Sequence, residues 1–286
     1  MENKRVTVIT VCYNAEGDIE RTMLSVLNQS YQNIEYIIID GASKDHTVDI
    51  AKQISSQYPQ RDIRVFSEPD KGIYDAMNKG ISKANGDWLN FMNAGDTFAS
   101  NSIVSDMVSE ISDGIRILRG NIIRNYNGVH VKSCGVVSQN PGLMDMFNNT
   151  FHHQACFIQR SLFHEFGLYS TAYKLCSDWK FFFDCVVLHH VKTKYVDKTV
   201  ALFEMDGASS KNVIRYINER ESYLKSVLGE EIFECLKELD LYRKSNLATA
   251  CYKLRLRLLS SLSPDMFNRL LTAKRMIRAF FHLKVN

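Results

Sequence analysis

Apolar and polar stretches alternate regularly through the first hundred residues. Four short apolar runs have the length of β-strands, at residues 6–13, 34–40, 62–67 and 87–92. Three intervening segments repeat apolar residues at helical spacing, at residues 17–29, 45–57 and 72–84. Strands that alternate with helices predict an α/β fold, in which a mainly parallel sheet is flanked by helices.

The pattern is less regular after residue 100. Residues 115–133 contain two short apolar stretches around Asn127-Gly128, which predicts a hairpin. Three further segments follow: a strand at 154–158, an amphipathic helix at 176–189 and a strand over 191–205. These segments complete the α/β domain that we predict for residues 1–210.

A basic helical extension is predicted for residues 211–286. Apolar positions recur there at helical spacing, and Ser263-Pro264 marks the start of the last helix. Residues 241–286 contain ten lysines and arginines against one acid, a net charge of +9. Since the whole chain carries +3, the remaining residues carry −6. The excess of positive charge on this segment favours contact with an anionic surface.

Cysteine usage and hydropathy indicate a cytoplasmic protein. The seven cysteines form no Cys-x-x-Cys pair, so we expect reduced, buried thiols rather than disulfides or a zinc site. The first apolar run is too short for a secretory signal, and no stretch approaches the roughly 20 apolar residues of a membrane span. Motifs typical of ATPases, dinucleotide-binding enzymes and serine hydrolases are absent from the sequence.

Polar residues follow the predicted strands at the points where they end. Asn14 follows the first strand, Asp40 ends the second, and Asp96 lies just beyond the fourth. The carboxyl ends of parallel strands meet at one edge of a sheet, where open α/β folds bind their ligands. The sequence therefore predicts one ligand crevice that Asn14, Asp40 and Asp96 share.

Seven short motifs occur in an order that is typical of one enzyme family. They are Thr10-Val-Cys-Tyr-Asn14, Ser25-Val-Leu-Asn-Gln-Ser30, Asp40-Gly-Ala-Ser-Lys-Asp45, Glu68-Pro-Asp-Lys-Gly-Ile-Tyr-Asp-Ala-Met-Asn78, Asn93-Ala-Gly-Asp96, His153-Gln154 and Ser177-Asp-Trp179. In this order they resemble a family 2 glycosyltransferase of the GT-A fold, from the bacterial branch that builds surface polysaccharides such as O-antigen and capsule. The resemblance implies a GT-A catalytic domain over residues 1–210.

The resemblance also implies an activity and its partners. Such an enzyme inverts the anomeric centre as it moves a sugar from a nucleotide-diphosphate donor, here a UDP-sugar, to a hydroxyl of a lipid-linked saccharide. The sugar would be a hexose or an N-acetylhexosamine. We expect no nucleic-acid partner, and the basic extension predicts contact with the inner face of the cytoplasmic membrane. The alternative is that its apolar stripe packs on the catalytic domain and its charges are only solvated.

The base of the donor would bind at the first two strand ends. In the family an aspartate at the position of Asp40 contacts uracil, although a turn aspartate is the alternative. Thr10, Tyr13 and Asn14 would line the same pocket, with Tyr13 stacked on the base. A buried tyrosine without a ligand is the competing interpretation.

Other residues would hold the diphosphate and the sugar. Lys71 can meet a phosphate beside a helix N-terminus, while Asp75 and Asn78 would face the donor sugar. The alternative for Lys71 is a solvated, charged start of a helix. His153 is expected to contact the metal or the diphosphate, although an isolated histidine is more often structural.

Asp96 is the predicted ligand of a divalent metal, Mn²⁺ or Mg²⁺, with an aspartate that only forms a turn as the alternative. Such an ion bridges two phosphates and takes only one or two protein carboxylates. The family often has Asp-x-Asp-Asp here, whereas this chain has Asn93-Ala-Gly-Asp96 and retains only the last carboxylate. Asn93 would instead contact a ribose or sugar hydroxyl.

Asp178 is the predicted general base, because the family has a carboxylate at this position that takes the proton of the acceptor. We expect partial burial beside Trp179 to raise the pKa of this carboxyl. The alternative is an aspartate that only caps a helix.

Two other functions are weighed against sugar transfer. A sugar-1-phosphate nucleotidyltransferase would need a loop rich in glycine and arginine after the first strand, which residues 14–21 do not provide. A non-catalytic subunit of a biosynthetic complex is disfavoured because Asp40, Asp96 and Asp178 are all retained.

Overall fold

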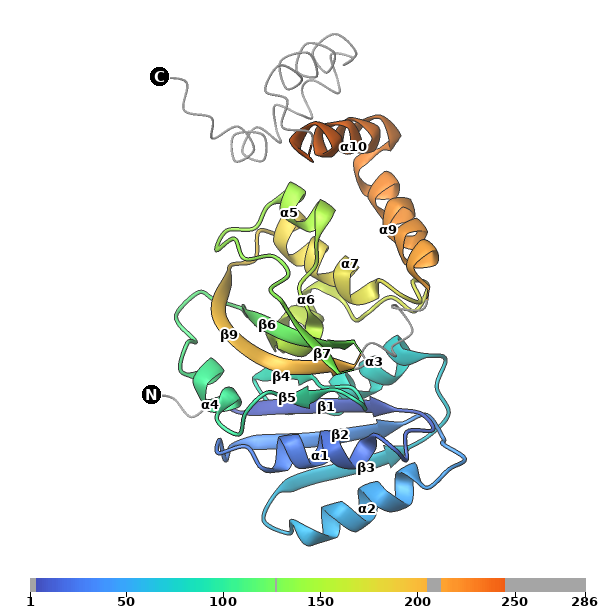
Figure 1. Cartoon of the computed structure of the whole chain (residues 1–286), viewed down its shortest axis with the longest axis vertical. Coiled ribbons are helices and arrows are strands. Elements are labelled where there is room, and N and C mark those ends of the chain that lie inside the picture. The colour runs from blue at the N-terminus through green and yellow to red at the C-terminus, as the bar shows by residue number, and fades with distance from the viewer. Residues whose placement is uncertain (1–3, 127, 205–211, 245–286) are drawn as a thin grey trace.

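A computed structural model describes residues 4–126, 128–204 and 212–244. Its centre is a nine-stranded mixed sheet with helices on both faces (Figure 1). The strand order is β3-β2-β1-β4-β8-β6-β9-β5, and β7 pairs with β6. The strands are β1 (Val6–Cys12), β2 (Ile34–Asp40), β3 (Asp62–Ser67), β4 (Trp88–Phe91), β5 (Thr97–Phe98), β6 (Ile117–Tyr126), β7 (Val129–Ser133), β8 (Cys156–Gln159) and β9 (Thr193–Glu204).

The N-terminal half of the sheet is parallel and its strand ends are aligned. In the pairing of β1 with β2 and of β2 with β3, Cys12 lies opposite Asp40, and Asp40 lies opposite Ser67. Strand β4 pairs with the other side of β1. The loops that follow these strands therefore leave the sheet at one common edge, as the crevice prediction requires.

The second half of the sheet brings a distant segment to the same edge. Strand β8 runs antiparallel to β4, with Leu89 opposite Ile158. The residues before β8 therefore lie at the carboxyl end of β4. They form a short 3₁₀ helix, η1 (His153–Ala155), which the side-chain amide of Asn90 fixes through hydrogen bonds to the carbonyls of Gln154 and Cys156.

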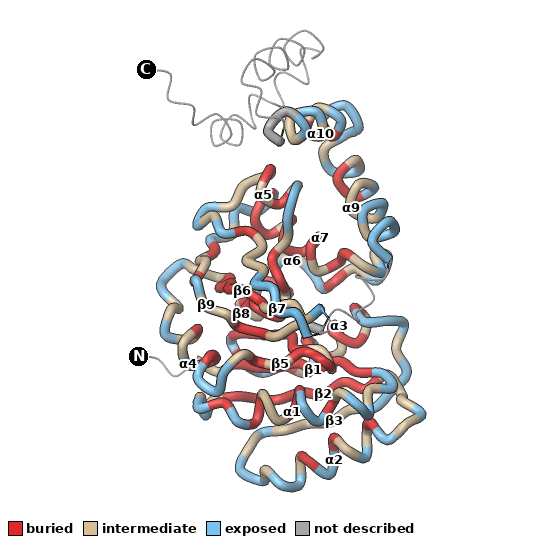
Figure 2. Tube along the Cα trace, in the orientation of Figure 1, coloured by how far each residue is buried: buried red, intermediate tan, exposed pale blue. Residues whose placement is uncertain are grey.

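Alternate residues of the strands pack into two hydrophobic cores. Along β1, Ile9 and Val11 face one core, whereas Val6 and Val8 face the other. Figure 2 shows the buried residues along the strands and the exposed outer faces of the covering helices. The helices are α1 (Ile19–Leu27), α2 (Thr47–Gln57), α3 (Ile73–Lys83), α4 (Ile103–Val108), α5 (Leu143–Asn148), α6 (Ser161–Phe166), α7 (Ser177–Phe183), α9 (Val213–Leu228) and α10 (Glu230–Lys244), with a π-helical turn η2 (Asp184–Leu188).

The predicted fold class is confirmed, and most of the predicted elements are present. The seven N-terminal strands and helices and the hairpin of β6 and β7 lie where the sequence places them. The helix predicted at 176–189 is interrupted, because its last turn widens into η2. Sequence analysis missed β5, α4, α5 and α6, which have six residues or fewer and are too short for a hydrophobic period.

The described part of the C-terminal extension packs on the α/β domain. Tyr223 and Leu224 of α9 and Phe233 of α10 are buried in the same core as Trp179 of α7. The basic segment after Lys244, including the helix predicted from Ser263, lies outside the described residues. Within the described ranges, no helix is both long and apolar enough to cross a bilayer. The six cysteines described there are free; four are buried, whereas Cys134 and Cys235 are partly exposed.

Candidate functional site

The loops after β1 and β2 are hydrogen-bonded to each other at the predicted crevice. Asn14 and Ala42 both have a positive φ, 48° and 62°, a backbone region that non-glycine residues seldom adopt. The side-chain oxygen of Asn14 accepts a hydrogen bond from the backbone N–H of Lys44, and the backbone N–H of Asn14 donates to Ser43. Strained residues of this kind cluster at ligand sites. Asn14 thus joins the two loops to each other.

Asp40 ends β2 as predicted, but its carboxylate is occupied by the protein. Asp40 is only 1% exposed. One oxygen accepts a hydrogen bond from the Ser43 hydroxyl, and the other accepts from the Ser43 backbone N–H and the Ser67 hydroxyl, at 2.5, 3.0 and 2.6 Å. This arrangement matches the alternative of a turn aspartate, since it joins the ends of β2 and β3.

Tyr13 and Thr10 differ sharply in exposure. Tyr13 is 61% exposed at the end of β1, which excludes the alternative of a buried tyrosine. Thr10 is fully buried, and its hydroxyl is hydrogen-bonded to the Met92 carbonyl and the Tyr36 hydroxyl. Thr10 is therefore a core residue and does not line the pocket, because it precedes the end of the strand by two positions.

A side chain at the start of α3 holds the backbone of the loop between β3 and α3. Asp75 accepts a hydrogen bond from the backbone N–H of Lys71, which closes the first turn of α3. The side-chain amide nitrogen of Asn78 donates to the Tyr169 carbonyl at 2.8 Å, and its oxygen accepts from the Tyr169 backbone N–H at 3.0 Å. Asn78 thus holds α3 to the chain beyond α6, and its amide is not available to a donor sugar. Lys71 is exposed at the entrance of the helix.

Asn93 and Asp96 form the turn that follows β4. The turn is fixed to α1, because the Thr22 hydroxyl donates to the carbonyl of Asp96 and accepts from the N–H of Gly95. Asp96 is 4% exposed, and one of its carboxylate oxygens accepts a hydrogen bond from the Gln154 amide at 3.1 Å. The side-chain oxygen of Asn93 is buried and has no hydrogen-bond partner among the residues that the structure describes. Both groups offer oxygen atoms at the predicted place.

Asp178 lies in a hydrogen-bonded cluster rather than alone. Its two oxygens contact the Tyr74 hydroxyl at 2.8 Å and Nδ1 of His153 at 3.0 Å. The other ring nitrogen of His153 contacts the amide nitrogen of Asn93 at 3.1 Å. The cluster therefore connects the start of α7 to the exits of β4 and η1. The side chains of Asp178 and His153 are 16% and 17% exposed, so both remain accessible.

The pKa of Asp178 moves opposite to the prediction. Burial raises the pKa of this carboxyl, as expected, but the hydrogen bond and charge of His153 and the Tyr74 hydroxyl outweigh burial and lower it. The alternative role as an N-cap is also excluded, because Cys176 occupies the N-cap position of α7. Asp178 is therefore an ionised carboxylate at neutral pH.

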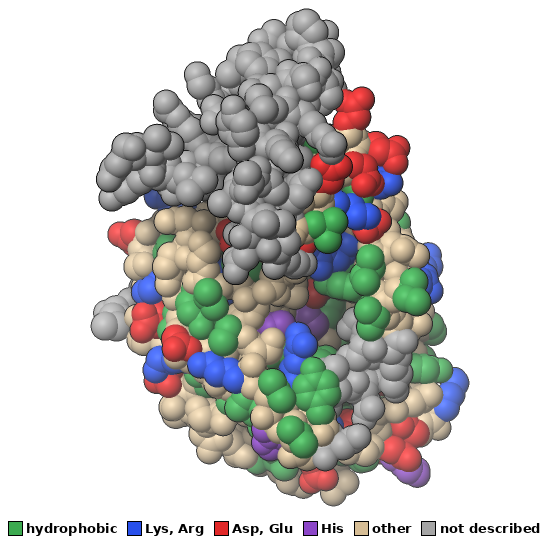
Figure 3. Space-filling view, turned by 45° about the horizontal axis from the view of Figure 1, so that its top comes forward, with side chains coloured by type: hydrophobic (Ala, Val, Ile, Leu, Met, Phe, Trp, Pro, Cys, Tyr) green, Lys and Arg blue, Asp and Glu red, His purple; other side chains and the backbone are tan. Residues whose placement is uncertain are grey.

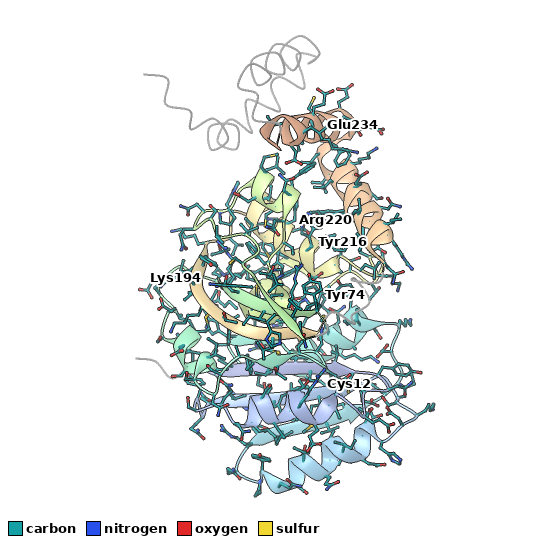
Figure 4. All side chains as sticks on the ribbon, in the orientation of Figure 1. Cys12, Tyr74, Lys194, Tyr216, Arg220 and Glu234 are labelled. Atoms are coloured by element: carbon teal, nitrogen blue, oxygen red, sulfur yellow. The ribbon has the colours of Figure 1, made fainter. Side chains whose placement is uncertain are left out.

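Three residues at the site were given no functional role from the sequence. Tyr74 and Asp70 lie in the quoted Glu68–Asn78 motif, which gave no reason to prefer them, and Gln154 adjoins His153. Their roles depend on contacts between segments far apart in the chain. Figure 4 labels Tyr74 in α3, above Cys12 at the end of β1.

The face shown in Figure 3 is hollowed, and histidine side chains lie on the floor of the hollow. Among the residues that the structure describes, no three histidine, cysteine, aspartate or glutamate side chains are grouped as a preformed metal site. The oxygen atoms of Asp96 thus form at most part of a coordination shell.

Comparison with known proteins identifies the sequence family. The profile described as "Glycosyl transferase family 2" matches residues 7–162. A "PGL/p-HBAD biosynthesis glycosyltransferase" of Mycobacterium bovis is 27% identical over 210 residues, which cover 73% of this chain and 80% of that protein. An uncharacterised glycosyltransferase of Haemophilus influenzae is 27% identical over 183 residues, 63% of this chain and 71% of its own.

Two solved structures share the fold. S. aureus TarS in complex with UDP-GlcNAc superposes with a TM-score of 0.62 at 16% identity, over 84% of this chain and 72% of TarS. The mannosyltransferase PcManGT from Pyrobaculum calidifontis, in complex with GDP-Man and Mn²⁺, has a TM-score of 0.65 at 16% identity, over 95% and 80% of the two chains. At this identity the likeness establishes the GT-A fold alone.

Proposed function

Since the chain belongs to glycosyl transferase family 2, we propose that it transfers a sugar from a UDP-sugar to an acceptor hydroxyl with inversion at the anomeric carbon. The observation that carries this proposal is the convergence of four strand-end segments at one edge of the sheet. Tyr13 and Asp40 belong to the first two, Asp96 follows β4, and His153 precedes β8.

In this proposal Asp178 is the general base. The acceptor hydroxyl loses its proton to the Asp178 carboxylate while its oxygen attacks the anomeric carbon, and the bond from that carbon to the diphosphate breaks. His153 and Tyr74 hold the carboxylate in place through the hydrogen bonds described above. A low pKa keeps the base unprotonated, although it also makes the base weaker.

A divalent cation fits the donor end of the site. Asp96 offers a carboxylate, the hard oxygen ligand that Mn²⁺ or Mg²⁺ prefers, and the remaining positions would be filled by diphosphate oxygens and water. Such an ion supplies positive charge that offsets the negative charge of the leaving diphosphate. Lys71 adds a cation, and Asn93 and Asp75 would orient the donor sugar.

We further propose that the sugar is a hexose or N-acetylhexosamine and that the acceptor is a lipid-linked saccharide of a surface polysaccharide such as O-antigen or capsule. The UDP-GlcNAc bound to TarS supports the first point only by analogy of fold. The motif order supports the second, and the basic segment at residues 241–286 gives the enzyme a means to reach a lipid acceptor from the cytoplasm.

Titration with UDP tests the donor site and its metal. We expect UDP to bind more tightly with Mn²⁺ than with chelator, because one lysine cannot neutralise a diphosphate. Asp96→Ala should remove this difference and leave metal-free binding nearly unchanged. Equal affinity of the unaltered protein with Mn²⁺ and with chelator would overturn the metal assignment, and the absence of UDP binding in both would overturn the donor assignment.

A further inference from the structure

We propose that Asp70, rather than Asp40, is the carboxylate that recognises the nucleobase, and that it selects a base with a single imide N–H, as in uracil. This inference rests on the proposed function, since it concerns the base of the nucleotide donor. It assigns a specificity-determining role to a residue in the loop between β3 and α3.

The first step is the state of Asp40. Each of its two carboxylate oxygens already accepts hydrogen bonds from the protein, and the residue is almost completely buried. A base that approached Asp40 would have to displace the donors of Ser43 or Ser67. Those donors would then be left without partners, at a cost of about 1–3 kcal/mol each.

The second step is the space beside Gly41, the next residue of the chain. A Cβ atom added to Gly41 would lie 2.5 Å from Oδ2 of Asp70 and 3.3 Å from Cδ2 of Tyr13. The Asp70 carboxylate and the Tyr13 ring therefore meet over the bare backbone of Gly41. A side chain at position 41 would collide with the carboxylate, so glycine is required for Asp70 to occupy this place.

The third step is the orientation of Asp70. The backbone N–H of Gly72 donates to Oδ1 of Asp70 at 2.8 Å, which leaves Oδ2 on the side of Gly41 and Tyr13. Tyr13 is mostly exposed, so its ring offers a face on which a base can stack. An aromatic face beside a fixed carboxylate oxygen matches a planar base with a hydrogen-bond donor on its edge.

The number of available oxygens distinguishes the bases. Uracil presents one ring N–H between two carbonyls, which suits a single acceptor such as Oδ2. Guanine presents two adjacent donors, N1–H and the N2 amino group, and pairs best with two carboxylate oxygens. Cytosine has an acceptor at N3, which a carboxylate repels. The geometry thus favours UDP over GDP and CDP.

Calorimetric titration of the full chain with UDP, GDP and CDP, in Mn²⁺, tests this inference. Asp70→Asn is the informative variant, because its single side-chain oxygen cannot serve both the Gly72 N–H and the base N–H. Glu68→Gln is the matched control, since it also removes one carboxylate from this loop. The Glu68 carboxylate pairs with the ammonium group of Lys79, at 3.9 Å, and has no part in the proposed base site. We expect Asp70→Asn to weaken UDP about 10- to 100-fold and CDP little, and Glu68→Gln to keep the preference for UDP.

Four results would overturn the inference in different ways. If Asp70→Asn weakens all three nucleotides equally, Asp70 only orders the loop. If Asp70→Asn keeps the preference for UDP, the base is recognised elsewhere and the proposed function still stands. If the unaltered protein prefers GDP, the inference fails together with the UDP-sugar donor of the proposed function, and only sugar transfer from another nucleotide remains. If the unaltered protein binds none of the three, the proposed function fails together with the inference.

Discussion

The two ends of the candidate site are built differently. At the ends of β1–β3, the exposed Tyr13 ring and Oδ2 of Asp70 meet over Gly41, on loops whose backbone is held by internal hydrogen bonds. Around Asp178, the charged side chain is mostly buried and its two oxygens already have protein partners. The first region exposes groups that can contact a ligand. In the second region, hydrogen bonds within the protein already fix the position of the carboxylate.

This difference suggests that the region at the strand ends serves nucleotide binding and the region around Asp178 serves the transfer reaction. An open aromatic surface gives affinity for the nucleotide and tolerates small changes. A carboxylate whose position is set by Tyr74 and His153 is suited to proton transfer, because its orientation costs nothing at the moment of reaction. Variants in the second region should therefore affect turnover more than donor binding, and the predictions below test this separation.

The largest expected effect is that of Asp178→Asn on turnover. The amide keeps the shape of the side chain but cannot accept the proton, so kcat should fall by about 10²- to 10⁴-fold. UDP affinity, measured by calorimetry on the same preparation, should stay within about twofold, because Asp178 lies outside the base region. A variant that loses UDP binding, or one with unaltered kcat, would show that Asp178 has a structural role only.

The second prediction concerns the support of α7. Arg220 of α9 lies 4.2 Å from the centre of the Trp179 ring and donates to the carbonyls of Met146 and Phe147, and Figure 4 shows it on the side of α9 that faces the body of the molecule. Arg220→Ala should lower the free energy of unfolding by about 2–4 kcal/mol, because the Phe147 carbonyl and the indole face lose this partner. The Met146 carbonyl keeps the hydrogen bond from the Trp179 indole N–H.

Arg215→Ala is the matched control for Arg220→Ala, since Arg215 lies on the same helix but is 63% exposed and pairs only with Glu219 among the described residues. We expect it to change the free energy of unfolding by less than about 1 kcal/mol. Chemical denaturation of both variants gives the comparison. Equal losses would mean that α9 is not anchored through Arg220.

The third prediction is a shift in pH dependence. Burial raises the pKa of Asp178, but His153 and Tyr74 outweigh it and lower the pKa, so activity is retained as the pH falls until Asp178 is protonated. Tyr74→Phe removes one hydrogen bond to the carboxylate and should raise this pKa. The acidic limb of the kcat/KM profile should then move to higher pH. An unchanged limb, or a move to lower pH, would show that another group controls it.

The smallest expected effect is that of removing the basic segment on turnover with a water-soluble acceptor. A chain that ends at Lys244 keeps α10 complete, and it should bind anionic liposomes less well because about 1 kcal/mol is lost per basic residue near the surface. Turnover with a water-soluble acceptor should be unchanged. Sedimentation at low salt measures the first quantity, and equal sedimentation of both chains would rule out the segment as an anchor.

The sequence predicted the parallel half of the sheet because long apolar runs and helical spacing are local signals. It also placed Asn14, Asp40 and Asp96 at one sheet edge, since strand ends of a parallel sheet meet there. It could not predict that Thr10 lies in the core or that Asn78 binds the backbone of Tyr169, because both depend on partners about 80 to 90 residues away.

The sign of the Asp178 pKa shift failed for the same reason. Burial was foreseen from the neighbouring tryptophan, but the stronger opposing contacts come from His153 and Tyr74, which are 25 and 104 residues distant. The role of Gly41 was equally hidden, because only the folded loops bring Asp70 to it.

Product analysis tests the central claim most directly. The protein is incubated with Mn²⁺, a panel of UDP-sugars and a membrane lipid extract, and in parallel with UTP and sugar-1-phosphates. Sugar transfer predicts release of UDP together with a glycosylated lipid that carries the inverted linkage. Formation of pyrophosphate from UTP and a sugar-1-phosphate would establish a nucleotidyltransferase, and UDP-sugar binding without any product would indicate a non-catalytic subunit; either result would contradict the account.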